Sequence, residues 1–204
     1  MKLILLDWNG TLLDDIPVWY DAVQEIFRRF GKEAPTIEQY FRELEGDYLA
    51  IYTSRGIEAT RDELNEIYEP HYQEHIHNAR LIPNVRKTLQ GLKRQGHTIW
   101  LVTGQQEQLV SPLLKKFRIS SYFRGGKFHA MNKAEVIREI REAEKVAQED
   151  CFLVGDAPSD IRHATRAGIT SIAFLGGYIP EELIRAAEPD HAIRQLSDIL
   201  NLVS

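Results

Sequence analysis

The chain has 204 residues, a formal net charge of −5, 43% hydrophobic residues and a single cysteine. This balance of apolar content and charge excludes a disordered chain, and one unpaired thiol, Cys151, excludes a disulfide scaffold and favours a reducing, cytoplasmic compartment. The longest apolar runs are only as long as a strand, so we expect no membrane span. The first of them, residues 3–6, ends at Asp7 and is shorter than the apolar core of a signal peptide.

The negative charge is concentrated in one segment. Residues 15–82 contain 14 Asp or Glu and 7 Lys or Arg, a net charge of −7, which leaves +2 for the rest of the chain. An acidic segment repels polyanions, and the sequence has no dense stripe of Lys and Arg. We therefore expect no nucleic-acid partner.

The N-terminal part predicts one buried strand followed by helices. Residues 2–6 are apolar and end at Asp7, which predicts a strand with a functional carboxyl end, and Asn9-Gly10 predicts a turn. Every signal in residues 16–78 is helical, and we interpret the aromatic residues there as the core of a small helical bundle. Capping-box patterns mark helix starts at Thr36 and Thr60.

After residue 82 the pattern alternates between helices and strands, which indicates a parallel sheet covered by helices. Helices are predicted at 83–95, 107–117, 132–147 and 161–167, strands at 98–102, 122–124, 151–154 and 170–174, and two short helices at the C-terminus. The sequence therefore predicts an α/β fold with a Rossmann-like parallel sheet and helices on both faces. An all-α segment is inserted after the first strand.

Polar residues follow the predicted strands, at the sheet edge where α/β proteins bind ligands. The carboxylates of Asp7, Asp156 and Asp160 would repel one another there unless a hard cation joined them. Oxygen ligands without His or Cys suit Mg²⁺. The hydroxyl of Thr103, the turn at Gly104 and a lysine complete an oxyanion-binding set that suits phosphoryl transfer.

These strand-end motifs resemble the haloacid dehalogenase (HAD) superfamily, in its phosphoglycolate-phosphatase-like branch with a helical cap. The motifs are Asp7-Trp8-Asn9-Gly10-Thr11, Thr103-Gly104, a lysine at 127 or 133, and Gly155-Asp156-Ala157-Pro158-Ser159-Asp160. The resemblance implies a catalytic core at residues 1–14 and 83–204 and a cap at 15–82. It also implies a Mg²⁺-dependent phosphatase that acts on a small phosphorylated metabolite.

The resemblance implies a role for each motif residue. Asp7 would be the nucleophile that forms an aspartyl-phosphate, and Thr11 would steady the first loop. The metal ligands would be the carboxylates of Asp7, Asp156 and Asp160 and the backbone carbonyl of Asn9. The phosphoryl group would be bound by Trp8, Asn9, Thr103, Gly104 and Lys133.

Two lysines compete for the role of offsetting the charge of Asp7 and the phosphate. Lys133 lies 23 residues before Asp156, a spacing similar to that of phosphoserine-phosphatase-like relatives, whereas Lys127 lies 29 residues before it. We favour Lys133 because the start of a helix would place it at the strand-end face.

Asn9 departs from the family pattern. Family phosphatases usually have Asp here, which protonates the leaving oxygen and then activates water. An amide does neither at neutral pH, so general acid-base catalysis is lost unless another group replaces Asn9. Such catalysis typically raises the reaction rate by about 10²–10⁴-fold. Four explanations stay open: a slow or specialised phosphatase, which we favour; chemistry that uses a long-lived aspartyl-phosphate; an engineered replacement; and deamidation at Asn9-Gly10.

Other functions are weighed against the phosphatase. His71-Tyr72-Gln73-Glu74-His75 matches the zinc-peptidase pattern H-x-x-E-H, but with no evident third ligand a solvated helix is favoured. A dehalogenase would need no metal, so the acids Asp156 and Asp160 argue against it. A phosphonatase would need a Schiff-base lysine in the cap, where Lys32 is the one lysine, and is weakly supported. A catalytically impaired binding or regulatory protein, motivated by Asn9, is the alternative of a different class. The sequence names neither the metabolite nor the oligomeric state.

Overall fold

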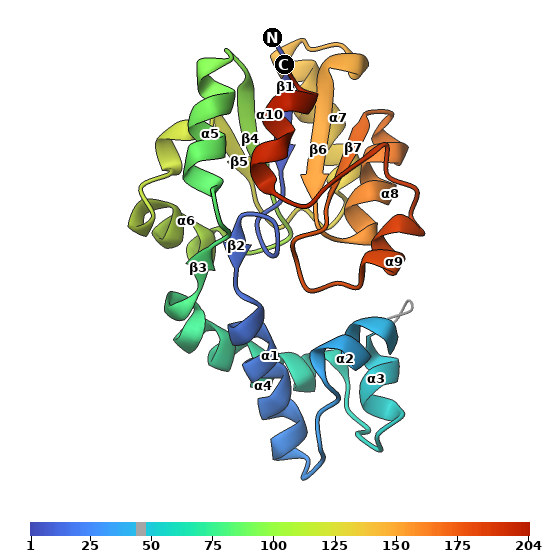
Figure 1. Ribbon diagram of the computed structural model, residues 1–204. Helices are drawn as coiled ribbons and strands as arrows, with labels where there is room; N and C mark the ends of the chain where they lie inside the picture. The colour runs from blue at the N-terminus through green and yellow to red at the C-terminus, as the bar shows by residue number, and fades with distance from the viewer. Residues whose placement is uncertain (44–47) are drawn as a thin grey trace. The chain divides into compact units, whose positions relative to one another are not determined.

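The computed structural model describes residues 1–43 and 48–204, and residues 44–47 of the predicted helical segment lie outside this description. The chain divides into two compact units (Figure 1). Unit 1 consists of Met1–Asp14, Leu81–Gly177 and Glu181–Ser204, and unit 2 consists of Asp15–Arg80 and Tyr178–Pro180.

Unit 1 is built on a parallel sheet with the strand order β5-β4-β1-β6-β7-β8. In β1 at the centre, Leu3 pairs with Thr98 on one side and with Cys151 on the other. The strands are β1 (Leu3–Leu6), β4 (Thr98–Val102), β5 (Gly125–Lys127), β6 (Cys151–Gly155), β7 (Thr170–Phe174) and β8 (His191–Ile193). The predicted parallel α/β sheet is confirmed.

Helices cover both faces of this sheet, because β1 is apolar at every position. Leu3 and Leu5 pack with Ile137 of α7 and Ala164 of α8. Ile4 and Leu6 point the other way and are equally buried, on the face where α5 and α10 lie (Figure 1). The helices are α5 (Val85–Arg94), α6 (Glu107–Lys116), α7 (Lys133–Glu144), α8 (Pro158–Ala167), α9 (Glu181–Arg185) and α10 (Ile199–Leu202), with 3-10 turns at Ser120–Tyr122, Gln148–Asp150 and Leu196–Asp198.

Between residues 16 and 78, the described regular elements of unit 2 are helical, as predicted. Its elements are α1 (Ile16–Arg29), α2 (Ile37–Glu43), α3 (Leu49–Thr53), α4 (Arg61–His75) and the 3-10 turn Ile76–Asn78. Its core mixes aliphatic and aromatic side chains, namely Val23, Ile26, Phe27, Tyr40, Ile51, Tyr52, Ile57 and Leu64. Both predicted capping boxes are present, at Thr36 and Thr60. A small sheet pairs β2 (Leu13–Asp14) with β3 (Arg80–Leu81).

The strand expected at 122–124 is misplaced. Tyr122 ends a 3-10 turn, Phe123 and Arg124 belong to no regular element, and the strand is Gly125–Lys127 instead. The ring of Trp100, on the neighbouring β4, lies so close to Gly125 that a Cβ there would be 2.6 Å from it. The pairing therefore requires glycine at 125, which β-propensity does not anticipate.

Two helix starts also differ from the prediction. The helix expected from Pro83 begins at Val85, because Asn84 adopts a left-handed φ of 66°. The helix expected from Ile161 begins at Pro158, since proline is favourable in the first turn. The prediction also missed β8.

Candidate active site

A buried lysine joins two carboxylates at the carboxyl end of the sheet. Lys133 Nζ donates to Asp7 Oδ1 at 2.6 Å and to Asp160 Oδ1 at 2.7 Å, and all three residues are less than a tenth exposed. The backbone N–H of Asp7 donates to the carbonyl of Val154 at 3.0 Å, which holds it beside β6. Charge-assisted bonds of this length fix the two carboxylates firmly.

The third carboxylate, Asp156, is held by the loop that follows β1. Thr11 Oγ1 donates to Asp156 Oδ1 at 2.9 Å. Gly10 has a left-handed φ of 74°, and a Cβ there would be 2.1 Å from Asp156 Oδ2. Glycine is therefore required at position 10 by both conformation and space. The bond from Thr11 therefore links this loop to Asp156.

Asp160 is positioned by the start of α8. Its Oδ2 accepts a hydrogen bond from the N–H of Ala157 at 3.3 Å, in the first helical turn, where a negative charge is favourable. A Cβ on Gly155 would be 2.3 Å from Asp160 Cγ. Gly155 and Gly10 are the positions whose packing role was not anticipated from the sequence, although each stands next to a motif residue.

The cluster contains three carboxylates and one lysine. Burial raises the pKa of Asp7 to about 6, with Lys133 acting against it. Burial also raises the pKa of Asp156 well above its usual range, and Asp7 and Asp160 add to this rise. Burial lowers the pKa of Lys133, but the charges of Asp160 and Asp7 outweigh it and the pKa rises. Unit 1 therefore holds more buried acid than its lysine can balance.

The carboxylates meet the requirements of a hard divalent cation. Their ligand oxygens, one each from Asp7, Asp156 and Asp160, all lie within 4.8 Å of one another. An all-oxygen donor set is the kind that Mg²⁺ prefers, and a cation there would relieve the repulsion between the buried acids. The three predicted carboxylate ligands thus fit the ion by donor type and by proximity, and the Asn9 carbonyl stays a prediction.

Thr103 lies at the end of β4, the strand next to β1. Its N–H donates to the carbonyl of Lys127 at 3.0 Å, and its carbonyl accepts from Ala130 N at 2.9 Å. Its hydroxyl oxygen accepts from the N–H of Gln105 at 3.1 Å. These bonds fix the turn through Gly104 at the same edge of the sheet as Asp7.

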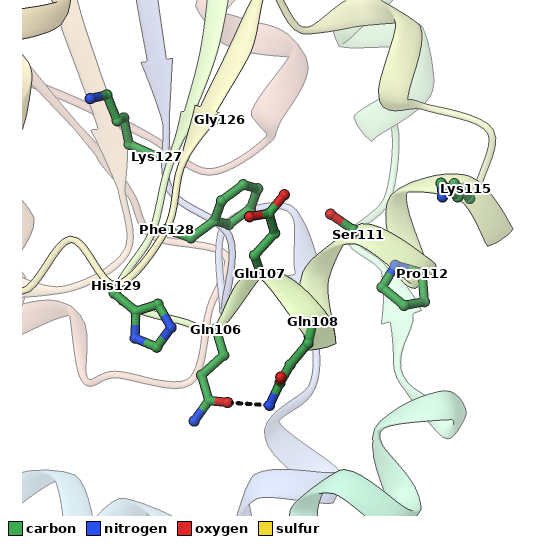
Figure 2. A pocket seen from close by; sticks show the side chains of 10 residues that line it. All are labelled: Gln106, Glu107, Gln108, Ser111, Pro112, Lys115, Gly126, Lys127, Phe128 and His129. Atoms are coloured by element: carbon green, nitrogen blue, oxygen red, sulfur yellow. Dashed lines mark hydrogen bonds between the residues drawn. The ribbon is translucent and has the colours of Figure 1, made fainter.

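The structure brings Lys133, not Lys127, to Asp7. Lys127 Nζ lies 3.3 Å from Glu139 Oε2 in an exposed ion pair. Figure 2 shows the Lys127 side chain pointing away from the other residues drawn. Its β5 position directs it to the surface, whereas Lys133 begins α7 and enters the cluster.

A groove of about 720 Å³ lies in unit 1 (Figure 2). The His129 ring is directed toward Gln106, whose Oε1 accepts from Gln108 Nε2 at 2.6 Å. The groove is lined by Gln106, Glu107, Gln108, Ser111, Pro112, Lys115, Gly126, Lys127, Phe128 and His129. The acidic cluster is not part of this lining, so the groove and the cluster are separate features of unit 1.

The rest of the first loop is tightly packed. Trp8 is 1% exposed, and its carbonyl accepts from Leu12 and Leu13, each at 2.9 Å. The side chain of Trp8 therefore belongs to the core of unit 1. The N–H of Gly10 donates to Leu13 O at 2.8 Å. This bond restrains the nitrogen that would attack the Asn9 side chain during deamidation.

The structure places a carboxylate, which the sequence did not indicate, beside the H-x-x-E-H segment. Asp21 Oδ2 lies 2.7 Å from His71 Nε2, although the two residues are 50 positions apart. His75 completes the group within unit 2. Sequence spacing could not predict the contribution of Asp21, because this residue lies on α1 whereas the histidines lie on α4.

The class that this fold defines is the Rossmann-like α/β enzymes, whose sites lie at the carboxyl end of a parallel sheet. Within that class, the chain belongs to the haloacid dehalogenase-like hydrolases, whose family model matches residues 4–174. The resemblance inferred from the motifs is confirmed, and with it the prediction that the protein is a hydrolase of this family.

Similar proteins agree with this assignment. A phosphoglycolate phosphatase of Vibrio vulnificus is 30% identical over 220 residues, which cover 100% of this chain and 96% of the relative. Phosphoglycolate phosphatase 1 of Pseudomonas aeruginosa is 28% identical and matches 98% of this chain and 78% of its own. A haloacid dehalogenase-like hydrolase from Streptococcus pneumoniae has the same fold, with a TM-score of 0.84 at 20% identity over 100% of this chain and 99% of its own.

Proposed function

We propose that the protein is a Mg²⁺-dependent phosphatase that hydrolyses a small phosphorylated metabolite through an aspartyl-phosphate at Asp7. The observation that carries the proposal is the buried cluster in which Lys133 bonds to Asp7 and Asp160. The relatives named phosphoglycolate phosphatase make a small phosphorylated carboxylic acid the first substrate to test.

In the first half-reaction, a carboxylate oxygen of Asp7 attacks phosphorus while the bond to the ester oxygen breaks and its electron pair leaves with that oxygen. Lys133 holds the attacking carboxylate and offsets its charge. The backbone of Trp8, Asn9 and Gly104 and the Thr103 hydroxyl would bind the phosphoryl oxygens. Mg²⁺, when bound to the three carboxylates and the Asn9 carbonyl, would neutralise charge on the phosphoryl group.

In the second half-reaction, water attacks phosphorus of the aspartyl-phosphate, which releases phosphate and restores Asp7. The side-chain amide of Asn9 supplies neither the proton for the leaving oxygen nor the base for this water. We therefore propose that the first step depends strongly on the leaving group and that the second step is slow.

We further propose that unit 2 is the cap that selects the substrate and excludes water. Because residues 15–82 carry a net charge of −7, an anionic substrate would be attracted by Lys133 and the cation rather than by the overall charge. Among the described residues, no helix is long and apolar enough to span a membrane. The thiol of Cys151 is free and buried, which supports a reducing, cytoplasmic location.

Phosphate release tests the proposal. The substrates are 4-nitrophenyl phosphate, alkyl phosphates and a panel of phosphorylated metabolites, each with Mg²⁺. We expect wild type to favour the aryl ester and to show a burst of nitrophenol. Asp7→Asn should lose at least about 10⁴-fold of activity. Asn9→Asp should gain about 10²–10⁴-fold and lose the preference for good leaving groups.

Asn9 also favours a second function, a HAD-fold protein that binds a phosphate ester without turning it over. That protein would bind the ester with Mg²⁺ but release no phosphate, and Asn9→Asp would not activate it. Absence of turnover across the whole panel in both wild type and Asn9→Asp would reject the phosphatase. Peptide mapping that finds only Asn at position 9 would eliminate deamidation as the source of any activity.

A further inference from the structure

We propose that unit 2 carries a second metal site, for a transition-metal ion such as Zn²⁺, formed by Asp21, His71 and His75. The site is independent of the proposed phosphatase function, because its three residues belong to α1 and α4 and not to the acidic cluster of unit 1.

The two histidines share one face of α4. Residues four positions apart on a helix are neighbours, and the imidazole rings of His71 and His75 stack with their centroids 4.5 Å apart and an angle of 26° between them. Both rings are partly exposed, so an ion can reach them from solvent. A pair of this kind offers two nitrogen ligands from one rigid element.

Asp21 supplies the third ligand from α1. Its Oδ2 is 2.7 Å from His71 Nε2, and one ligand atom from each of the three residues lies within 4.8 Å of the others. Ligands bound to tetrahedral zinc at about 2.0–2.1 Å lie about 3.3 Å apart. Small side-chain rotations therefore bring the three atoms to binding distance, and the exposed side of Asp21 leaves the fourth position to water.

The hydrogen bonds around the histidines prepare them for a metal. His75 Nδ1 lies 2.9 Å from the carbonyl oxygen of His71. A carbonyl only accepts, so Nδ1 carries the hydrogen and Nε2 of the neutral ring presents its lone pair. His71 Nε2 donates a hydrogen bond to Asp21 Oδ2 in the metal-free protein. When an ion binds to Nε2, this hydrogen leaves it, either for Nδ1 of the same ring or for solvent.

The chemistry of the site differs from that of the unit 1 cluster. Two imidazole nitrogens with one carboxylate suit Zn²⁺, Co²⁺ or Ni²⁺, whereas the three carboxylates of unit 1 suit Mg²⁺. An ion at this site would link α1 to α4 and so stabilise unit 2. This role uses the two histidines of the H-x-x-E-H match and assigns no peptidase function to Glu74.

Metal titration of the untagged, full-length protein tests the proposal. Isothermal titration with Zn²⁺ is carried out in excess Mg²⁺, which saturates the acidic cluster, and Co²⁺ is added separately as a spectroscopic probe. We expect one Zn²⁺ per chain, a tetrahedral Co²⁺ absorption band, and a rise in melting temperature with Zn²⁺. His71→Ala and His75→Ala should weaken Zn²⁺ binding at least about 100-fold, and Asp21→Asn about 10-fold to 100-fold.

His77→Ala is the matched control, since His77 is an exposed histidine two positions beyond His75. It should bind Zn²⁺ as wild type does. The proposal is overturned if wild type shows no saturable Zn²⁺ binding, or if binding survives the combined His71→Ala and His75→Ala change. Asp21→Asn changes an exposed side chain and keeps its shape, so it tests the site even if a histidine variant misfolds. Binding that is retained in Asp156→Asn would separate this site from that of unit 1.

Discussion

The two units assemble polar groups in different ways. In unit 1 the parallel strands and the helix starts bring Asp7 and Lys133, 126 positions apart, into one buried cluster. In unit 2 the buried Glu25 forms its ion pairs with Arg28 and Arg29 on the same helix. The edge of a parallel sheet gathers distant residues, whereas a helix mostly pairs its own neighbours. Unit 1 is therefore the place where a dense charged site is expected.

Replacement of the buried lysine should give the largest effect. Lys133→Met leaves the carboxylates of Asp7 and Asp160 buried without their partner. We expect unfolding free energy to fall by about 3–5 kcal/mol and kcat/KM for the aryl phosphate to fall about 10²–10³-fold. Chemical denaturation and steady-state kinetics measure the two effects.

Lys127→Met is the matched control for this change, since it removes the same charge from an exposed pair with Glu139. It should cost at most about 1 kcal/mol and alter kcat/KM less than about twofold. Equal losses in the two variants would contradict the assignment of Lys133 to the cluster.

The sequence predicted the parts of unit 1 that follow from simple rules. Asp7 and Asp156 stand after apolar strands, and Lys133 stands at a helix start, so topology alone placed them at one edge. What remained hidden depends on packing in three dimensions. The closeness of Trp100 to Gly125, which shifts β5, is not encoded in local propensity.

The partner of His71 shows the same limit in unit 2. The i, i+4 histidine pair is visible in the sequence because it follows helix periodicity. Asp21 is not, since its approach depends on how α1 packs against α4. Propensity finds the helices, but the pairing of their faces is decided by the apolar core between them.

Replacement of Gly155, the glycine that accommodates Asp160, should give an intermediate effect. In Gly155→Ala the new Cβ would be 2.3 Å from Asp160 Cγ, so the carboxylate must move. We expect the Mg²⁺ concentration for half-maximal phosphate release to rise about 10-fold to 100-fold, with a loss of about 1–3 kcal/mol in stability. An unchanged Mg²⁺ dependence would mean that Asp160 does not act at the cation site.

The smallest effect is expected in unit 2, at the start of α4. Thr60 Oγ1 accepts from Glu63 N at 3.3 Å, and Glu63 Oε2 accepts from Thr60 N at 2.8 Å. Thr60→Ala removes the first bond, together with the one that the hydroxyl donates to Glu63 Oε2 at 2.8 Å, and should lower the unfolding free energy by about 1 kcal/mol. The helix depends on this cap because Pro70 interrupts its backbone bonds.

Thr60→Ser keeps the hydroxyl and should retain most of this stability. Chemical denaturation followed by circular dichroism measures the loss, and hydrogen exchange of the α4 amides locates it. Equal losses in Thr60→Ala and Thr60→Ser would show that the methyl group of Thr60, rather than its capping hydroxyl, stabilises the helix. Because a cap acts only on its own helix, the exchange of β1 and β6 should stay unchanged, which separates a local effect in unit 2 from the cooperative loss expected for Lys133→Met.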